Sequence, residues 1–153
     1  MRRFLLYIIL ICLFSCTSTY NSNYSKKQYI LNEDIEIVAA YDKFDGRFTP
    51  SIEVINKSLA RIAVFIDTQS SSYQNGQYAF IRNNLNKYYI QFAGIIRNNK
   101  KVLLCNFIYN DDEKYFDYEN KYFRIFGGGS RYWNIEVDIE TYNCQNIWIN
   151  APF

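Results

Sequence analysis

The most reactive side chains in this sequence are its four cysteines, and the chain has no histidine. Without an imidazole there is no His-based general acid or base, no Ser–His or Cys–His pair and no His-ligated zinc. Cys12 and Cys16 lie near the start of the sequence, whereas Cys105 and Cys144 lie far along it. A disulfide between Cys105 and Cys144 requires that they lie on adjacent strands, and the alternative is two separate buried thiols.

Carboxylates are the other groups that could catalyse a reaction or bind a metal. The acidic segment 110–120, NDDEKYFDYEN, lacks the alternating oxygen ligands and the glycine of a calcium loop. Glu136 and Asp138 alternate with apolar residues, and their simplest interpretation is solvated surface on the wet face of a strand. The glycine run 127–129 has strand patterns on both sides, which indicates a turn and not a phosphate-binding loop. The sequence therefore predicts no catalytic residue, no metal ligand and no cofactor.

Aromatic residues make up 19% of the chain. Tyr132 and Trp148, together with neighbouring asparagines, are candidates for a surface that binds a sugar or a peptide. The alternative is ordinary side-chain packing on a sheet, and an AT-rich genome would also enrich Tyr, Asn, Lys, Ile and Phe.

The first sixteen residues have the three parts of an export signal: two arginines, an apolar run from Phe4 to Phe14, and the small residue Ser15. The apolar run is too short to serve as a permanent membrane helix. The stretch Leu13-Phe14-Ser15-Cys16 resembles the lipobox of bacterial lipoproteins. This resemblance implies cleavage between Ser15 and Cys16, acylation of Cys16, and a place in the cell envelope, at the outer membrane. More than one acyl chain is what stable anchoring requires.

Removal of residues 1–15 as a signal peptide would leave 138 of the 153 residues, the usual size of one domain. Residues 16–33 are rich in Ser, Thr, Asn and Lys without periodicity, which predicts a flexible tether before a single domain over residues 34–153. Because Arg2 and Arg3 leave with the signal, 15 basic and 15 acidic residues remain. A neutral chain gives no electrostatic reason to expect nucleic acid as a partner.

The clearest helical pattern runs from about Pro50 to Asp67, with Thr49 as the expected N-cap. Apolar residues recur there at steps of three and four: Ile52, Ile55, Leu59, Ile62 and Ile66. A weaker pattern over Asp34 to Phe44 favours a short helix over a strand. After the long helix we expect a polar loop from Thr68 to Gln77 with a turn at Asn75-Gly76.

The second half of the chain alternates with a period of two, which predicts strands. Segments 87–97 and 101–109 flank Asn98-Asn99-Lys100 and should form a hairpin. Further strands are expected at 122–126, 131–139 and 145–150, with turns between them and Cys144 in a turn. On the 131–139 strand one face is expected to be buried, made of Trp133, Ile135, Val137 and Ile139.

These elements predict an α+β fold in which one long amphipathic helix packs on an antiparallel β-meander of four to five strands. Their order resembles cystatin-like folds. The segment from Tyr122 to Asn150 also resembles the C-terminal part of small uncharacterised secreted bacterial proteins, a resemblance that implies no activity.

The sequence thus predicts a lipid-anchored envelope protein that acts by binding, with the membrane and an envelope protein as partners. A binding, inhibitor-like or immunity-like module should expose an aromatic patch. One alternative is an enzyme that acts on envelope polymers through carboxylate or Tyr residues, which would need a pocket with two carboxylates. The other is a purely structural envelope lipoprotein, which needs neither feature.

Overall fold

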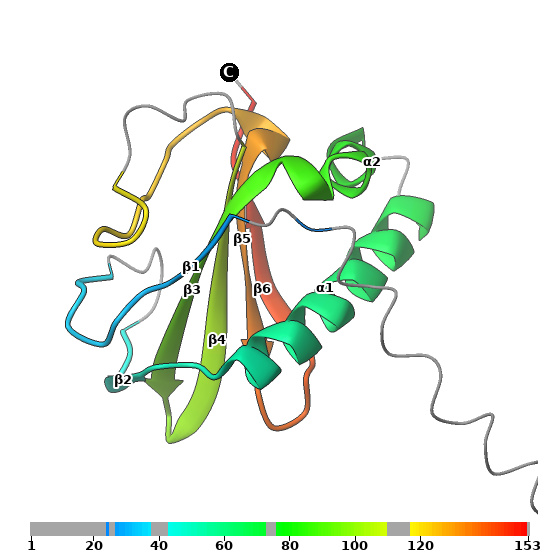
Figure 1. Ribbon diagram of the computed structural model, residues 1–153. Coiled ribbons are helices and arrows are strands. Elements are labelled where there is room, and N and C mark those ends of the chain that lie inside the picture. Colours follow the sequence, from blue (N-terminus) through cyan, green and yellow to red (C-terminus); the bar gives the residue numbers. More distant parts are fainter. Residues whose placement is uncertain (1–23, 25–26, 38–42, 73–75, 110–116, 153) are drawn as a thin grey trace, which may run out of the picture.

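The computed structural model describes residues 24, 27–37, 43–72, 76–109 and 117–152. In these residues the chain has an α+β fold: two α-helices and one mixed, six-stranded sheet (Figure 1). The elements are β1 (Gln28–Ile30), β2 (Gly46–Phe48), α1 (Ile52–Ser72), α2 (Gly76–Asn83), β3 (Tyr88–Arg97), β4 (Lys100–Tyr109), β5 (Tyr132–Asp138) and β6 (Cys144–Ile149). The predicted meander is β3 to β6, and its outer edge at β3 pairs with β1 in parallel and with β2 antiparallel.

Helix α1 begins two residues later than the Thr49-Pro50 signal indicated. Its first turn is capped by Ser51, whose side-chain oxygen accepts a hydrogen bond from the Val54 N–H at 3.3 Å. Thr49 is not the cap, because its N–H and hydroxyl both donate to a carboxylate oxygen of Glu33, at 2.9 and 3.1 Å. Thr49 therefore bonds to Glu33, which is distant in sequence, and not to the first turn of the helix as the local sequence predicted.

The same helix also ends later than predicted, so residues 68–72 are helical where a loop was expected. Their hydroxyl groups bond back into the helix: Thr68 donates to the Val64 carbonyl, and Ser70 and Ser71 donate to the Asp67 carbonyl, all at 2.9 Å. After residues outside the described part, Gly76 begins helix α2, so the expected Asn75-Gly76 loop is in part a second helix.

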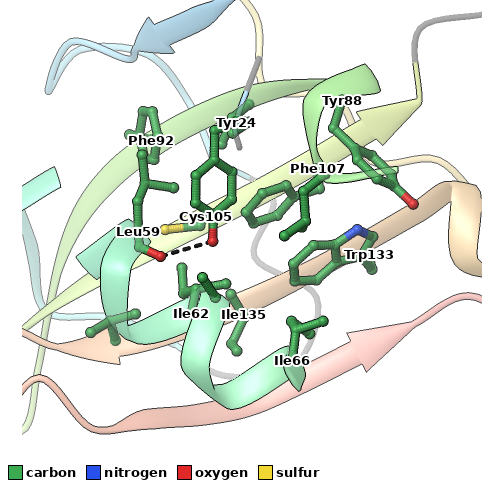
Figure 2. Close-up of a cluster of buried hydrophobic side chains, with 14 of the residues drawn as sticks. Tyr24, Leu59, Ile62, Ile66, Tyr88, Phe92, Cys105, Phe107, Trp133 and Ile135 are labelled. Atoms are coloured by element: carbon green, nitrogen blue, oxygen red, sulfur yellow. Dashed lines mark hydrogen bonds between the residues drawn. The ribbon is translucent and has the colours of Figure 1, made fainter. Parts of the chain in front are cut away.

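The apolar line of α1 packs on one face of the sheet, as its spacing predicted. Ile55, Leu59, Ile62 and Ile66 are each at most 2% exposed, whereas Ile52 at the start of the line is 62% exposed. Opposite them, the Phe107 and Trp133 rings stack with centroids 3.8 Å apart and planes 6° apart (Figure 2). A large apolar core therefore lies between α1 and strands β3 to β6.

The β3–β4 hairpin forms where it was predicted. Arg97 pairs with Lys100, so the loop has two residues, Asn98 and Asn99, with φ of 51° and 61°. Positive φ at both positions is typical of the type I′ turn that suits the twist of a hairpin, and Asn tolerates it. Leu103, Cys105 and Phe107 of β4 lie in the core beside the helix. On β5 the predicted face of Trp133, Ile135 and Val137 is buried, as expected.

Residues 122–126 are not the predicted strand, although their composition is strand-like. Side chains, and not a neighbouring strand, bind their carbonyl groups: Asn106 binds the Phe123 carbonyl at 2.8 Å and Asn150 binds the Ile125 carbonyl at 2.6 Å. Cys144, expected in a turn, is the first residue of β6.

The folded domain begins before residue 34, so part of the predicted tether belongs to it. Tyr24 is 5% exposed and donates a hydrogen bond to the Leu59 carbonyl at 2.8 Å (Figure 2). Strand β1 lies at residues 28–30 and pairs with β3. The remaining residues of the 16–33 segment, apart from 27 and 31–33, lie outside the described part.

The weak helix predicted over Asp34 to Phe44 is absent from its described residues, 34–37 and 43–44, which form turns and irregular structure. Here the carbonyl groups are bound by Arg47, which donates to Ile35 at 2.6 Å and to Asn32 at 3.1 Å. Such bonds replace the local bonds of a helix. Residues 38–42 of that prediction lie outside the described part.

Candidate functional site

A row of polar side chains crosses the sheet on the face that points away from α1. The strand register places Gln91, Asn106, Asn134 and Trp148 side by side on β3, β4, β5 and β6. They share one face because their sequence neighbours, such as Trp133, point into the helix-side core, and side chains alternate along a strand. Three of the four members of this row, Asn106, Asn134 and Trp148, line the pocket described below.

Two members of the row, Gln91 and Asn106, are buried and hold a crossing segment in place. We call this segment, residues 117–127, the strap. The Gln91 amide donates to the Tyr118 and Lys121 carbonyls at 2.9 and 2.6 Å. Asn106 donates to the Gln91 side-chain oxygen at 3.1 Å and to the strap itself. The two amides thus satisfy each other and the strap backbone, as buried polar groups must.

Asn150 holds the other end of the strap. Its side-chain N–H groups donate to the Ile125 carbonyl at 2.6 Å and to the Gly127 carbonyl at 2.9 Å. Figure 1 shows the strap, in yellow to orange, on the side of the sheet opposite α1. Because it is hydrogen-bonded at both ends, the strap has a fixed position over this face of the sheet.

A pocket of about 170 Å³ lies between the strap and strands β4 to β6. Its lining residues come from these two parts and from the two residues after β6: Asn106, Ile108, Tyr122, Phe123, Arg124, Ile125, Phe126, Gly127, Tyr132, Trp133, Asn134, Trp148, Asn150 and Ala151. The structure therefore brings Tyr132 and Trp148, the two candidates from the sequence, to one pocket. The sequence did not identify the strap residues Tyr122, Arg124 and Phe126, although their dense alternation of aromatic and polar residues was a usable signal.

The pocket has an exposed aromatic rim. In the described part of the chain four large hydrophobic side chains are exposed, and two of them, Phe126 (73%) and Trp148 (46%), line this pocket. The other two, Ile52 and Val64, lie on α1. The Arg124 guanidinium lies over the Phe126 ring, 4.7 Å from its centroid. An exposed aromatic patch at a pocket is a feature of binding surfaces.

The polar wall of the pocket consists of neutral groups. The Asn134 side-chain amide makes no hydrogen bond to any residue that the structure describes. Burial raises the pKa of Tyr122 to about 12 from its ordinary value near 10, and its hydroxyl is protonated at neutral pH in either case. Arg124 is the one charged side chain among the described lining residues.

Glu136, which the alternation placed on a wet surface, is instead buried, with 7% of its surface exposed. Its carboxylate accepts two hydrogen bonds from the Arg97 guanidinium, at 2.7 and 2.9 Å, and one from Asn146 at 2.8 Å. The prediction failed because Arg97 is 39 residues away in sequence and the ion pair forms only in the folded sheet. Glu136 therefore has a structural partner, Arg97, across the sheet.

Asp138 stabilises the turn between β5 and β6. One of its carboxylate oxygens accepts hydrogen bonds from the Glu140 and Thr141 N–H groups, both at 2.9 Å. The bond from the Thr141 backbone N–H holds the pKa of Asp138 below its usual value. Across the described residues, no three acidic or cysteine side chains gather as a metal site would require. Part of the acidic 110–120 segment, residues 110–116, lies outside them.

Cys105 and Cys144 are free thiols in the structure, so the bridge considered from the sequence is not formed. They lie on β4 and β6 with β5 between them. Adjacent strands are about 4.8 Å apart, so Cα atoms two strands apart are separated by about 10 Å, beyond the reach of a disulfide. Burial raises the pKa of Cys144 to about 11, and burial also raises the pKa of Cys105 well above its usual value.

Residues 1–15, with Ser15, and the predicted lipidation site Cys16 lie outside the described part of the chain. No helix within the described part has the length and apolar character needed to cross a membrane. No protein-family model, curated protein or solved structure matches this chain.

Proposed function

We propose that this chain is a lipid-anchored protein of the bacterial cell envelope, at the outer membrane, that acts by binding and not by catalysis. The lipobox-like stretch ending at Cys16 supports the anchor. The observation that carries the binding function is the pocket under the strap, where the exposed side chains of Phe126 and Trp148 meet a neutral polar wall. A fixed, aromatic-lined pocket with few polar groups is the usual form of a ligand site.

A protein partner is a second candidate, in the form of an inhibitor-like or immunity-like module. It is favoured by β6, the last strand of the sheet, whose sequence CQNIWI has no charged residue. An uncharged edge strand offers its free N–H and carbonyl groups to an added strand. The order of long helix and meander also fits a cystatin-like arrangement, which is part of this second proposal.

The enzyme and structural alternatives have less support. An enzyme acting on envelope polymers needs a free pair of carboxylates, whereas Glu136 and Asp138 are each bound by other groups of the fold. A purely structural role gives no reason for two aromatic side chains to be exposed at one pocket.

The anchor is tested by intact mass and membrane fractionation of the full chain and of Cys16→Ala, both expressed in a bacterial host. We expect the wild type to carry acyl mass and to sediment with membranes, and the variant to do neither. Two unacylated, soluble proteins would refute the anchor.

The binding function is tested separately, by co-sedimentation of the detergent-solubilised full chain with delipidated envelope fragments. Trp148→Ala should lose this binding. The matched control is Val64→Ala, because Val64 is 43% exposed on α1, close to the 46% of Trp148. Equal behaviour of the two variants, or no binding by the wild type, would refute a ligand site under the strap.

A further inference from the structure

We propose that the pocket under the strap binds one neutral sugar unit of an envelope glycan. This inference rests on the binding function proposed above and names its ligand class. Three properties of the described residues support it: the size of the pocket, the chemistry of its rim and wall, and the rigidity of the strap.

The size of the pocket fits one ring. Its volume of about 170 Å³ is less than the roughly 300 Å³ at which pockets for drug-sized ligands begin. The pocket therefore has room for a single six-membered ring, and the rest of a longer ligand would continue outside it.

The rim offers flat apolar surfaces to such a ring. The indole of Trp148 and the ring of Phe126 are both exposed at the pocket. A sugar ring has one face of C–H groups that covers an aromatic ring, while its hydroxyl groups point outward from the ring edge. Aromatic side chains supply large contact area at low cost in conformational entropy.

The polar groups that line the pocket favour a sugar over an apolar side chain of a peptide. The Asn134 amide, which has no hydrogen-bond partner among the described residues, would be covered and left unpaired by an apolar group. Each such unpaired group weakens binding by about tenfold. A sugar hydroxyl both donates and accepts, and can pair with the Asn134 amide.

The charges in the pocket disfavour a cationic ligand. No carboxylate is found among the described lining residues, so nothing there attracts a cation. Among these residues the one charged group is the Arg124 guanidinium, which lies over the Phe126 ring. A neutral sugar would leave this contact in place.

The strap is already held in position before any ligand binds. Gln91, Asn106 and Asn150 hold the strap through its carbonyl groups without any ligand. A preformed pocket does not lose affinity to the ordering of its own walls. This matters for a weak ligand such as a single sugar unit.

The test uses the full chain in a zwitterionic detergent that contains no sugar, because glycoside detergents would compete for the pocket. Calorimetry is followed during titration of the wild type and its variants with three neutral trisaccharides: N-acetylated chitotriose, cellotriose and maltotriose. An uncharged, tryptophan-containing peptide is the competing probe. We expect saturable binding of at least one trisaccharide and no saturable binding of the peptide.

Trp148→Ala should weaken trisaccharide binding by about tenfold or more, and Asn134→Ala by about fivefold, with circular dichroism unchanged. Trp148→Tyr, which keeps a ring, should retain most of the affinity, and Val64→Ala all of it. The proposal is overturned if no trisaccharide binds, if Trp148→Ala binds like the wild type, or if only the peptide saturates. In these cases binding of the wild type to envelope fragments, lost in Trp148→Ala, would still support the broader binding function.

Discussion

Substitution of Tyr24 tests where the folded domain begins. The sequence places this residue in a flexible tether, whereas in the structure it is 5% exposed and its hydroxyl donates to the Leu59 carbonyl at 2.8 Å. Its ring lies 6.4 Å from that of Phe107, measured between centroids. Both the ring and the hydroxyl should therefore contribute to the free energy of unfolding.

The two contributions can be separated by two variants. Tyr24→Phe removes one buried hydrogen bond, and we expect a loss of about 1 kcal/mol. Tyr24→Ala also removes the ring from the core, and losses of about 3–5 kcal/mol are typical of such changes. We expect about 3 kcal/mol here, at the low end of this range.

Urea unfolding followed by circular dichroism measures both losses. With a slope of about 2 kcal/mol per molar urea, Tyr24→Ala should lower the midpoint by about 1.5 M and Tyr24→Phe by about 0.5 M. Phe126→Ala is the control, because Phe126 is 73% exposed and its loss should cost less than about 1 kcal/mol. If Tyr24→Ala shifts the midpoint no more than this control does, Tyr24 does not pack in the core and the tether boundary near residue 33 is correct.

Three further predictions concern the sheet. Glu136→Gln leaves the Arg97 guanidinium largely buried without its counter-charge, so urea unfolding should show a loss of about 3 kcal/mol, and a loss below about 0.5 kcal/mol would contradict a buried ion pair. Gly94→Ala places a Cβ 2.2 Å from the carbonyl oxygen of Phe48 on strand β2, and in the same assay it should lower the free energy of unfolding by about 1–3 kcal/mol. The control is Gly76→Ala, whose Cβ meets nothing within 4 Å and should cause no loss; equal effects of the two variants would refute this close approach. The Cys144 thiol has its pKa raised to about 11 from roughly 8.5 in an unfolded chain, so the neutral thiol stabilises the fold below pH 8.5 and this stabilisation is lost toward pH 11. Alkylation located on Cys144 by mass spectrometry should accordingly be slow at pH 8 and accelerate toward pH 11, and fast labelling at pH 8 would contradict its burial.

Elements with a strong local signal could be predicted from the sequence. The apolar line of α1, the Asn98-Asn99 turn and the alternation of β5 were all recognised, because helix periodicity, positive φ and strand alternation depend on residues close together in the chain. Two residues of the candidate site, Tyr132 and Trp148, were identified from their type alone. The α+β class follows from these elements.

Features that depend on distant partners could not be predicted. Glu136 is buried because Arg97 lies beside it across the sheet, and the strap takes no strand partner because Asn106 and Asn150 bind its carbonyl groups. Tyr24 is part of the core only because α1 and β4 meet around it.

For this protein the sequence by itself determined the helix, the hairpin, the faces of β5 and the absence of histidine chemistry. The tertiary structure alone decided that residues from the strap and from three strands form one pocket. Local periodicity shows which face of an element is apolar, but it contains no information on which distant element covers that face. Burial of a polar group depends on that partner, because a carboxylate or an amide is buried only where a donor or acceptor from elsewhere in the chain reaches it.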